Sequence, residues 1–436
     1  MHGCRNRIKV NLLLCLICSA ITGFCLENNV PVAEKGFEMK DYSQTFIWSD
    51  GWCLESDKAW FVDGMSNTLF CVKLHSGKCE KVGCIPESKK GAYRRNPYCV
   101  KCGKDIFCIP GYGESIWIYN LDDKNFTEIN LEGLGECHLG KQAWVWNDKI
   151  FIVVANWNKI IEISISQREV TAYHTICEDD NVQKSILVGD KIYAVSSGFG
   201  RIYQFDLLTK KVTVHLLPDR EKKMFAMCFD GERFWLSGYQ NEVYLWDKEK
   251  DSFTTISLSN VYEVYNFDKM AEKITDNNVP PVFNRIIYVG GFIWFIPIHS
   301  KKILYADKKN AALSVLEIHE EDKISVSLQK MQGIGNFLME YVRDSRYIGL
   351  FSAQNSRVLE VDTEQLTYQW KKYYLTEHYL RQYCEACEGV YYEAKDPLCV
   401  QDYHMRKRTE STKVRKTAVY SVGMKIHAKL IKENML

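Results

Sequence analysis

Two pairs of cysteines have the spacing at which thiolates hold a zinc ion. Two residues separate Cys99 from Cys102, and two separate Cys384 from Cys387. Together they would supply the four sulfur ligands of a tetrahedral zinc site. Both pairs also have a structural explanation, because Cys102 and Gly103 fall at a predicted hairpin and the later pair falls on the apolar face of a predicted helix. We therefore expect no cofactor, with zinc at these four cysteines as the alternative.

The sequence lacks the motifs of several common enzyme classes. Its ten histidines form no His-Glu-x-x-His pair, and no Gly-x-Ser-x-Gly nucleophile motif occurs. The segments Gly111-Tyr112-Gly113 and Gly333-Ile334-Gly335 each have two glycines. A phosphate-binding loop has a third glycine and a following helix, which neither segment is predicted to have. The linear sequence thus assigns no catalytic residue, which favours a protein that is not an enzyme.

Five side chains with rings recur at related places along the chain. Each follows a predicted buried strand position by four to six residues: Tyr112, Trp157, Phe199, Tyr239 and His299. Rings presented on a loop can stack on a sugar or anchor a peptide, since they offer a large apolar area at low entropy cost. They can equally pack against neighbouring parts of the fold. Which of these they do depends on the elements that carry them.

A repeat of seven units occupies most of the chain and carries these rings. Each unit has an anchor, usually aromatic, that is expected to be buried on a strand: Trp60, Phe107, Phe151, Tyr193, Trp235, Trp294 and, more weakly, Gly349. Four residues before each anchor is a residue that accepts tight-turn backbone angles: Ser56, Gly103, Asn147, Gly189, Gly231, Gly290 and Ser345. Two more apolar columns follow, always ten residues apart: Leu69 and Cys79, Ile116 and Phe126, Ile160 and Val170, Ile202 and Val212, Val243 and Phe253, Ile303 and Leu313, and Val358 and Tyr368.

The segments around these columns predict antiparallel strands. Apolar and polar residues alternate with period two, as in Ile202-Tyr203-Gln204-Phe205-Asp206. A polar hairpin lies between the second and third columns, and an aspartate precedes it in several units: Asp206, Asp247, Asp307 and Asp362. A unit of four strands repeated every 42 to 59 residues predicts an all-β fold, a single β-propeller of seven four-stranded antiparallel blades.

One unit shows which propeller repeats the chain resembles. The segment Arg201-Ile202-Tyr203-Gln204-Phe205-Asp206-Leu207 is similar to the repeats of kelch, WD40 and related bacterial propellers. Kelch repeats carry a double glycine, whereas here single glycines occur at Gly64, Gly111 and Gly238. WD40 strands end in Trp-Asp, which occurs here only at Trp246-Asp247. The resemblance covers about residues 39–374, with kelch-like repeats slightly ahead on period, and implies a propeller without identifying a family.

Residues 1–38 precede the repeat and can be interpreted in two ways. A basic start and a short apolar run resemble a secretory signal peptide, which implies an exported, extracytoplasmic protein with no transmembrane span in the mature chain. Alternatively, translation starts at Met39 and the protein is cytoplasmic. The 13 cysteines beyond Cys25 are odd in number and scattered, which favours the cytoplasm. The two interpretations remain open.

Residues 375–436 follow the repeat and are predicted to form a helical and basic tail. Thr376 can cap a helix that Gly389 would end, and residues 405–436 carry nine Lys and Arg against Glu410 and Glu433. Such a tail can dock on an anionic partner or remain solvated. Two insertions, at about residues 257–281 and 317–341, lengthen the last units of the repeat.

The composition limits the kinds of partner. With 56 Lys and Arg against 55 Asp and Glu, the formal net charge is +1, which argues against specific nucleic acid binding. We therefore predict a non-enzymatic binding or scaffold propeller that presents a loop face to a protein or carbohydrate partner, with an undetermined oligomeric state. The alternative is a propeller hydrolase or lyase acting on a carbohydrate or lactone, which would assemble acids and histidines from several blades.

Overall fold

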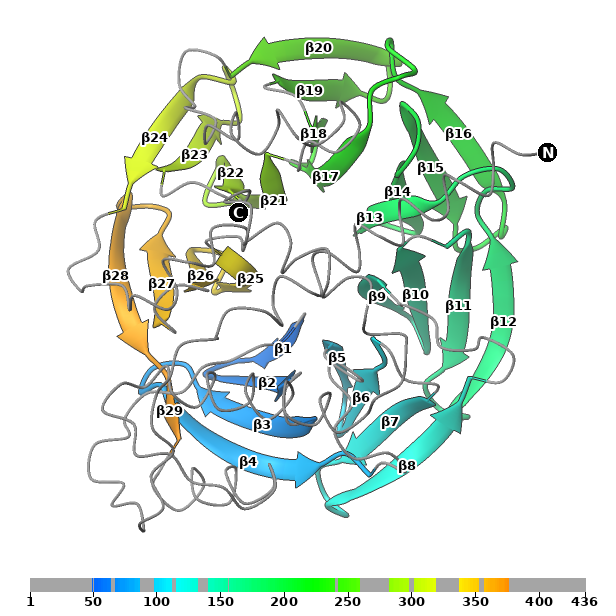
Figure 1. Cartoon of the computed structure of the whole chain (residues 1–436), viewed down its shortest axis with the longest axis vertical. Coiled ribbons are helices and arrows are strands. Elements are labelled where there is room, and N and C mark those ends of the chain that lie inside the picture. The colour runs from blue at the N-terminus through cyan, green and yellow to red at the C-terminus, as the bar shows by residue number, and fades with distance from the viewer. Residues whose placement is uncertain are drawn as a thin grey trace, which may run out of the picture.

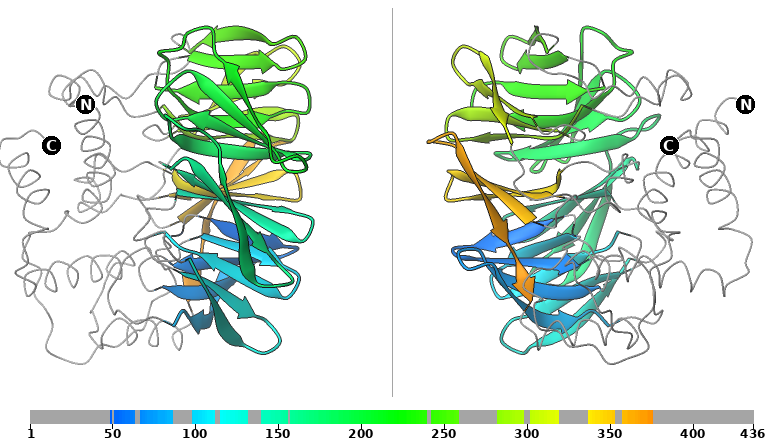
Figure 2. Two further views of the ribbon diagram at one scale, coloured as in Figure 1. Left: turned by 90° about the vertical axis from the view of Figure 1, so that its right-hand side faces the viewer. Right: turned by 60° about the vertical axis from the view of Figure 1, so that its left-hand side comes forward.

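The described part of the chain forms a ring of seven sheets. The computed structural model describes residue 49 and residues 51–63, 67–86, 98–111, 115–131, 140–155, 157–239, 242–258, 282–297, 302–318, 337–352 and 357–375. The sheets are arranged around one axis (Figure 1), and from the side they form a single disc (Figure 2). The chain is therefore a seven-bladed β-propeller, as the repeat predicts. These residues contain strands and turns and no helix, so none of them forms a helix that could cross a membrane.

Each blade is one continuous stretch of chain in which the first strand is innermost. The strands of blades 1 to 4 are β1 (Trp52–Glu55), β2 (Lys58–Asp63), β3 (Thr68–Lys73) and β4 (Lys78–Cys84); β5 (Tyr98–Cys102), β6 (Asp105–Ile109), β7 (Ser115–Asn120) and β8 (Asn125–Asn130); β9 (Gly140–Trp146), β10 (Lys149–Ala155), β11 (Lys159–Ser164) and β12 (Glu169–Thr175); and β13 (Val182–Val188), β14 (Lys191–Ser196), β15 (Arg201–Asp206) and β16 (Val212–Leu216). Those of blades 5 to 7 are β17 (Met224–Phe229), β18 (Phe234–Gly238), β19 (Glu242–Asp247) and β20 (Ser252–Ser257); β21 (Phe283–Val289), β22 (Phe292–Pro297), β23 (Lys302–Asp307) and β24 (Leu313–Glu317); and β25 (Phe337–Arg343), β26 (Tyr347–Ser352), β27 (Arg357–Asp362) and β28 (Thr367–Lys372).

Two turns in every blade require positive φ angles. The turn between the first and second strands has φ between 51° and 96° at all seven predicted positions: Ser56, Gly103, Asn147, Gly189, Gly231, Gly290 and Ser345. The turn between the third and fourth strands has φ between 46° and 74° at seven more positions: Gly77, Lys124, Arg168, Lys210, Asp251, Ala311 and Leu366. Left-handed residues of this kind reverse the chain within a short loop, so the sequence positions of the turns determine the strand boundaries.

The acidic column before the second turn caps its backbone. The Asp206 carboxylate accepts hydrogen bonds from the backbone N–H groups of Leu208 at 3.0 Å and Thr209 at 2.7 Å. Equivalent bonds reach the backbone two and three residues on from Asp307 and Asp362, and three residues on from Asp247. Such Asx turns satisfy N–H groups that a tight turn leaves without a strand partner.

The hydrophobic core lies between neighbouring blades. Each core cluster combines the facing sides of two adjacent sheets, and the anchors Phe107, Phe151, Trp235 and Trp294 are fully buried. The seventh unit has no anchor side chain of its own. Instead the ring of Tyr341, which faces Gly349 across the β25–β26 pair, covers it so closely that an added Cβ would lie 2.1 Å from the ring.

The ring closes between blades 7 and 1. A short strand, β29 (Tyr374–Leu375), pairs in parallel with β4, so the end of the described chain extends the sheet of the first blade. On the inner side, the Trp52 ring lies 4.3 Å from the Phe61 ring of its own blade and 4.3 Å from the Phe351 ring of blade 7. Hydrogen bonding at the edge and aromatic packing at the centre therefore close the ring together.

Several predictions fall outside the described residues. These concern the leader and possible start at Met39, the tail helix, and most of the two insertions. They remain predictions.

Candidate functional site

Three of the five predicted ring residues lie on one face of the propeller. Because successive strands are antiparallel, all loops between second and third strands leave the blades at the same end. Trp157, Phe199 and Tyr239 occupy these loops in blades 3, 4 and 5, and all three are half-buried. We call this end the loop face. Tyr112 and His299 fall outside the described residues.

Each aromatic side chain makes different contacts on the loop face. Trp157 packs against the core between blades 2 and 3, and the Lys159 ammonium lies 5.4 Å from the centre of its ring. The Arg201 guanidinium lies 4.7 Å from the centre of the Phe199 ring. Tyr239 meets the Phe225 ring edge to face at 6.2 Å. The predicted residues are therefore partly structural, and two of them pair with basic side chains.

A buried carboxylate holds the loops of blade 4 around Phe199. Asp180 precedes β13 and is 9% exposed. It accepts hydrogen bonds from the hydroxyls of Ser196 at 2.5 Å and Tyr203 at 2.7 Å. Ser196 in turn accepts the backbone N–H of Phe199 at 2.8 Å. This chain of bonds fixes the loop that presents Phe199.

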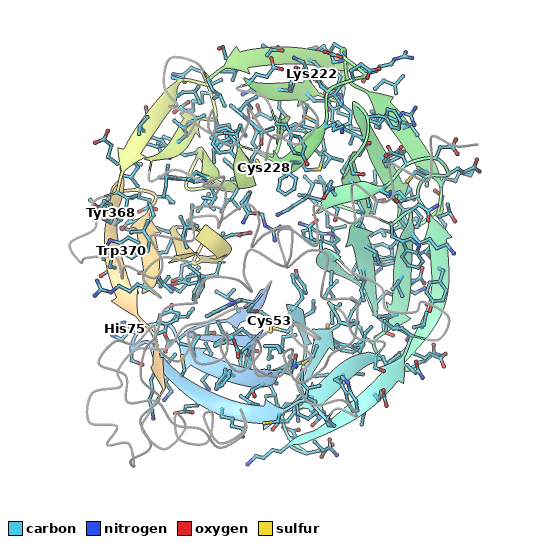
Figure 3. All side chains as sticks on the ribbon, in the orientation of Figure 1. Cys53, His75, Lys222, Cys228, Tyr368 and Trp370 are labelled. Atoms are coloured by element: carbon cyan, nitrogen blue, oxygen red, sulfur yellow. The ribbon has the colours of Figure 1, made fainter. Side chains whose placement is uncertain are left out.

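Blade 5 adds another basic and aromatic pair to this face. The Lys222 ammonium lies 5.3 Å from the centre of the Tyr244 ring and 2.5 Å from its hydroxyl, and it also contacts Glu242 (Lys222 is labelled in Figure 3). Burial raises the pKa of Tyr244 to about 12. Burial opposes the charge of Lys222, but its hydrogen bond to Glu242 is strong enough to raise the Lys222 pKa. Both side chains therefore keep their protons at neutral pH.

Four of the innermost strands contain a β-bulge among their first residues, which are the residues next to the loop face. The register shifts between Val182 and Ser185 in β13, and similar shifts occur at the start of β17, β21 and β25. The corresponding strands of blades 1 to 3 pair with their neighbours without such a shift. A bulge adds a residue to one strand and turns side chains away from the regular alternation. In blades 4 to 7 the side chains at the start of the innermost strand therefore depart from the alternation of a regular strand.

Side chains on the innermost strands of blades 4 to 7 contact one another from blade to blade, and we name Lys184, Phe225, Asn284, Arg285 and Glu340 the axial cluster. The Lys184 ammonium of blade 4 lies 5.1 Å from the centre of the Phe225 ring of blade 5. It donates to the backbone oxygen of Asn284 in blade 6 at 2.9 Å and to its amide oxygen at 3.2 Å. Arg285 Nε lies 3.0 Å from a carboxylate oxygen of Glu340 in blade 7. Phe225 also contacts Tyr239, so the cluster continues into the loop face.

Tyr98 of the second blade lies close enough to this cluster for the charge of Arg285 to affect its pKa. Burial raises the pKa of Tyr98 to about 12, and the nearby positive charge of Arg285 opposes that rise. The ring lies over Gly51, where an added Cβ would be 2.1 Å from it. Glycine at this position therefore leaves the space in which Tyr98 packs.

The two cysteines of the first predicted pair lie on β5 and differ in burial. Cys102 ends β5 at the turn of Gly103 and is half-buried, and burial raises its pKa to about 11. Cys99 is 1% exposed, and its sulfur lies 3.4 Å from that of Cys53. Cys384 and Cys387 lie outside the described residues. Among the side chains that the structure describes, no group of three or more His, Cys, Asp and Glu could hold a metal ion.

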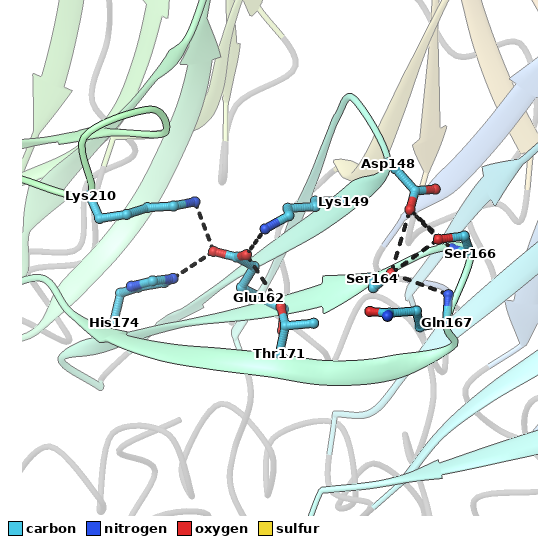
Figure 4. A network of polar contacts seen from close by, with 9 residues as sticks. All are labelled: Asp148, Lys149, Glu162, Ser164, Ser166, Gln167, Thr171, His174 and Lys210. Carbon is cyan, nitrogen blue, oxygen red and sulfur yellow. Dashed lines mark hydrogen bonds and ion pairs between the residues drawn. The ribbon is translucent and has the colours of Figure 1, made fainter.

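A buried charged network centred on Glu162 ties two blades together (Figure 4). Glu162 in β11 is 3% exposed and contacts Lys149, His174 at 2.7 Å, and Lys210 of blade 4 at 2.8 Å. Although burial opposes its charge, hydrogen bonds to these partners lower the pKa of Glu162 to about 2. A carboxylate so fully paired serves the blade interface, because it has no weakly held proton to exchange.

Comparisons with known proteins identify the fold and no family. No protein-family model matches the chain, and no curated protein matches its sequence. Among solved structures, the chain is similar to a virginiamycin B lyase from Staphylococcus aureus, with a TM-score of 0.51 and 12% identity over 71% of this chain and 92% of that one. A streptogramin B lyase structure has a TM-score of 0.51 and 10% identity over 77% of this chain and 96% of that one. At such low identity these similarities concern the propeller fold alone.

The axial cluster has no motif that marks it in the amino-acid sequence. Lys184, Asn284 and Arg285 have no motif around them, and their strands look regular in the sequence. The available signal was positional, since each lies at the start of a first strand, just before the alternating segment.

Proposed function

We propose that this protein is a non-enzymatic binding propeller that holds a peptide segment of a protein partner on its loop face. The observation that carries the proposal is the axial cluster, in which bulged strands bring Lys184, Phe225 and Asn284 of three blades into contact. A peptide presents charged groups, apolar side chains and backbone polar groups. The cation, the aromatic ring and the amide of this cluster can contact one of these each. Rigid strands position these groups, which reduces the entropy lost on binding.

The basic and aromatic pairs favour a peptide over a sugar. A sugar ring stacks on an open aromatic face. Here Lys159 lies over Trp157 and Arg201 over Phe199, so one side of each ring already faces a cation. Aromatic and arginine side chains are also the residues that most often dominate protein interfaces. The two lyases share only the fold with this chain, so they lend no support to a catalytic role.

Selection from a peptide library tests the proposal. Peptides selected on the wild-type protein should bind the Phe199→Ala and Lys184→Ala variants at least about tenfold more weakly, as expected for residues near the centre of an interface. Leu208→Ala is the matched control, because Leu208 is 64% exposed in the hairpin between β15 and β16, at the opposite face. Thermal unfolding of each variant confirms that it is folded.

Three results would overturn the proposal. Folded wild-type protein that enriches no peptide would do so, as would selected peptides that bind all variants equally. Binding to a glycan array that Phe199→Ala abolishes, without peptide enrichment, would instead assign the face to carbohydrate.

A further inference from the structure

Two buried cysteines from neighbouring blades point at each other. Cys53 lies on β1, the innermost strand of blade 1 (labelled in Figure 3), and Cys99 lies on β5, the innermost strand of blade 2. Their sulfur atoms are 3.4 Å apart, although the residues are separated by 46 positions in the chain. The contact therefore depends on the packing of one blade against the next.

The surroundings fix the directions of both thiols. Cys53 is 9% exposed and Cys99 is 1% exposed. Both sulfur atoms approach the backbone oxygen of Trp60, at 3.7 Å and 3.1 Å respectively. Because the same carbonyl attracts both thiols, neither must turn far to meet the other.

A third cysteine nearby has a different direction. Cys108 faces Cys99 across the β5–β6 pair, and it is fully buried. Its thiol approaches the backbone oxygen of Ile106 on its own strand at 3.9 Å. Cys108 therefore lies close to Cys99 while its thiol is directed to the backbone of its own strand, which makes it a matched control.

We propose that Cys53 and Cys99 are oxidised to a disulfide that links blade 1 to blade 2. A disulfide bond is about 2.05 Å long, so the two sulfur atoms must approach by roughly 1.4 Å, a movement within reach of side-chain rotation. The oxidant is a low-molecular-weight disulfide such as oxidised glutathione. One cysteine thiolate attacks oxidised glutathione, which releases one glutathione thiol and leaves a mixed disulfide between the cysteine and glutathione. The second cysteine thiolate then attacks the cysteine sulfur of this mixed disulfide and displaces the second glutathione thiol. The two cysteines lose two electrons and two protons, and one glutathione disulfide becomes two thiols.

Burial determines when this reaction occurs. Burial raises the pKa of Cys53 well above that of a free cysteine, and the neighbouring Cys99 raises it further. Thiolate is the attacking species, so it is scarce in the closed structure. The exchange is therefore expected during folding, or when the edges of blades 1 and 2 open transiently. Once formed, the bond closes a loop of 46 residues and restricts the unfolded chain.

Thiol mapping of the full-length protein tests the proposal. The protein is refolded in a buffer of reduced and oxidised glutathione, its free thiols are alkylated, and its peptides are analysed by mass spectrometry. We expect a cross-linked peptide pair containing Cys53 and Cys99, lighter by two hydrogens than the separate peptides. Cys53→Ala and Cys99→Ala should each abolish it, while Cys108→Ala should retain it. The oxidised protein should melt roughly 5–10 °C higher than the reduced protein.

The exposed Cys84 serves as an internal control for the oxidant. If Cys84 is modified by glutathione while Cys53 and Cys99 remain fully alkylated, the proposal is wrong. A link between Cys99 and Cys108 would also contradict it. Should an alanine variant fail to fold, the peptide map of the wild-type protein decides the question alone.

Discussion

At the scale of single residues, one buried carboxylate joins a turn to a core anchor. Asp230 is 1% exposed and accepts the backbone N–H groups of Glu232 at 2.8 Å and Arg233 at 2.7 Å. Its other oxygen accepts the indole N–H of Trp235 at 2.7 Å. The anchor of blade 5 is therefore held by polar contacts as well as by packing, and charged acceptors make such bonds strong.

Replacement of Trp235 separates these two contributions. Trp235→Gly removes the packing and the hydrogen bond, and we expect it to cost roughly 3–5 kcal/mol or to unfold the protein. Trp235→Phe keeps most of the ring but leaves a buried carboxylate oxygen without its donor, which should cost about 1–3 kcal/mol. Urea unfolding measures both. Near-wild-type stability of the glycine variant would contradict the placement of this blade.

Glu162 should make the stability of the protein depend on pH in acid. Its pKa of about 2 in the folded protein lies below the ordinary value of a glutamate. The folded state therefore favours the charged form, so this contribution is present above about pH 4.5 and is lost as the pH falls toward 2. We expect Glu162→Gln to destabilise the protein by roughly 2–3 kcal/mol at pH 6. That difference should shrink as the pH approaches 2.

Chemical denaturation of both proteins between pH 2 and pH 6 measures this difference. Asp122→Asn is a suitable control, because Asp122 is exposed and pairs only with the exposed Lys104 among its described salt bridges. A surface pair of this kind contributes little. A constant gap between wild type and Glu162→Gln across this pH range would show that the Glu162 charge is not what stabilises the interface.

At the scale of strands, the seventh blade differs from the others because its core side chain comes from β25, whereas the anchors of the other blades lie on the second strand. Gly349 on β26 leaves room for the ring of Tyr341 on β25, which is 2% exposed. The Tyr341 hydroxyl donates to Glu360 at 3.1 Å and lies 2.9 Å from that of Tyr373. One aromatic side chain thus fills the core position and links β25 to β27 and to the residue between β28 and β29.

Gly349→Ala tests this exchange. The new methyl group would overlap the Tyr341 ring, so the ring or the strand must shift, and we expect a loss of about 1–3 kcal/mol. Adding Tyr341→Leu, which removes the overlapping ring, should make the alanine nearly neutral relative to Tyr341→Leu alone. Urea unfolding of the four proteins in this cycle measures the coupling. Purely additive effects would contradict the direct contact.

The turns could be predicted from sequence because their chemistry is local. A positive φ favours glycine, asparagine and small polar residues, and these occupy the first turn of all seven blades. The second turns were predicted from polar residues and preceding aspartates, although Ala311 and Leu366 also adopt positive φ there. In these two cases the strand pairing on either side imposes the backbone angle.

The axial cluster and the cysteine pair could not be predicted in the same way. A bulge arises from the pairing of two strands, and no residue type near Lys184 marks it. Cys99 had a local spacing that suggested zinc with Cys102, whereas its sulfur lies 3.4 Å from that of Cys53 on another blade. Contacts between blades depend on the packing of the ring, which spacing along the chain does not encode.

At the scale of the whole molecule, stability depends on how the ring closes. The four strands of each blade are consecutive in the chain, and the only link between the described strands of the first and last blades through a shared sheet is β29, which follows blade 7 and joins the sheet of blade 1. The closure relies on the two residue pairs that join β29 to β4, and on the contact of the Trp52 ring with Phe351 of blade 7. Tyr373 extends those contacts, since its ring lies 6.1 Å from Trp52 and 5.8 Å from Phe351.

Trp52→Ala should open this seam before the rest of the ring. The substitution removes an indole packed between two blades, which costs roughly 3–5 kcal/mol. Because the lost contacts belong to blades 1 and 7, their amides should exchange hydrogen faster, while those of blade 4 on the far side of the ring stay protected. Hydrogen exchange read by mass spectrometry resolves the blades. Trp52→Phe, which keeps a ring, should show the same pattern more weakly, and an equal rise in exchange across all seven blades would mean that the ring unfolds as one unit.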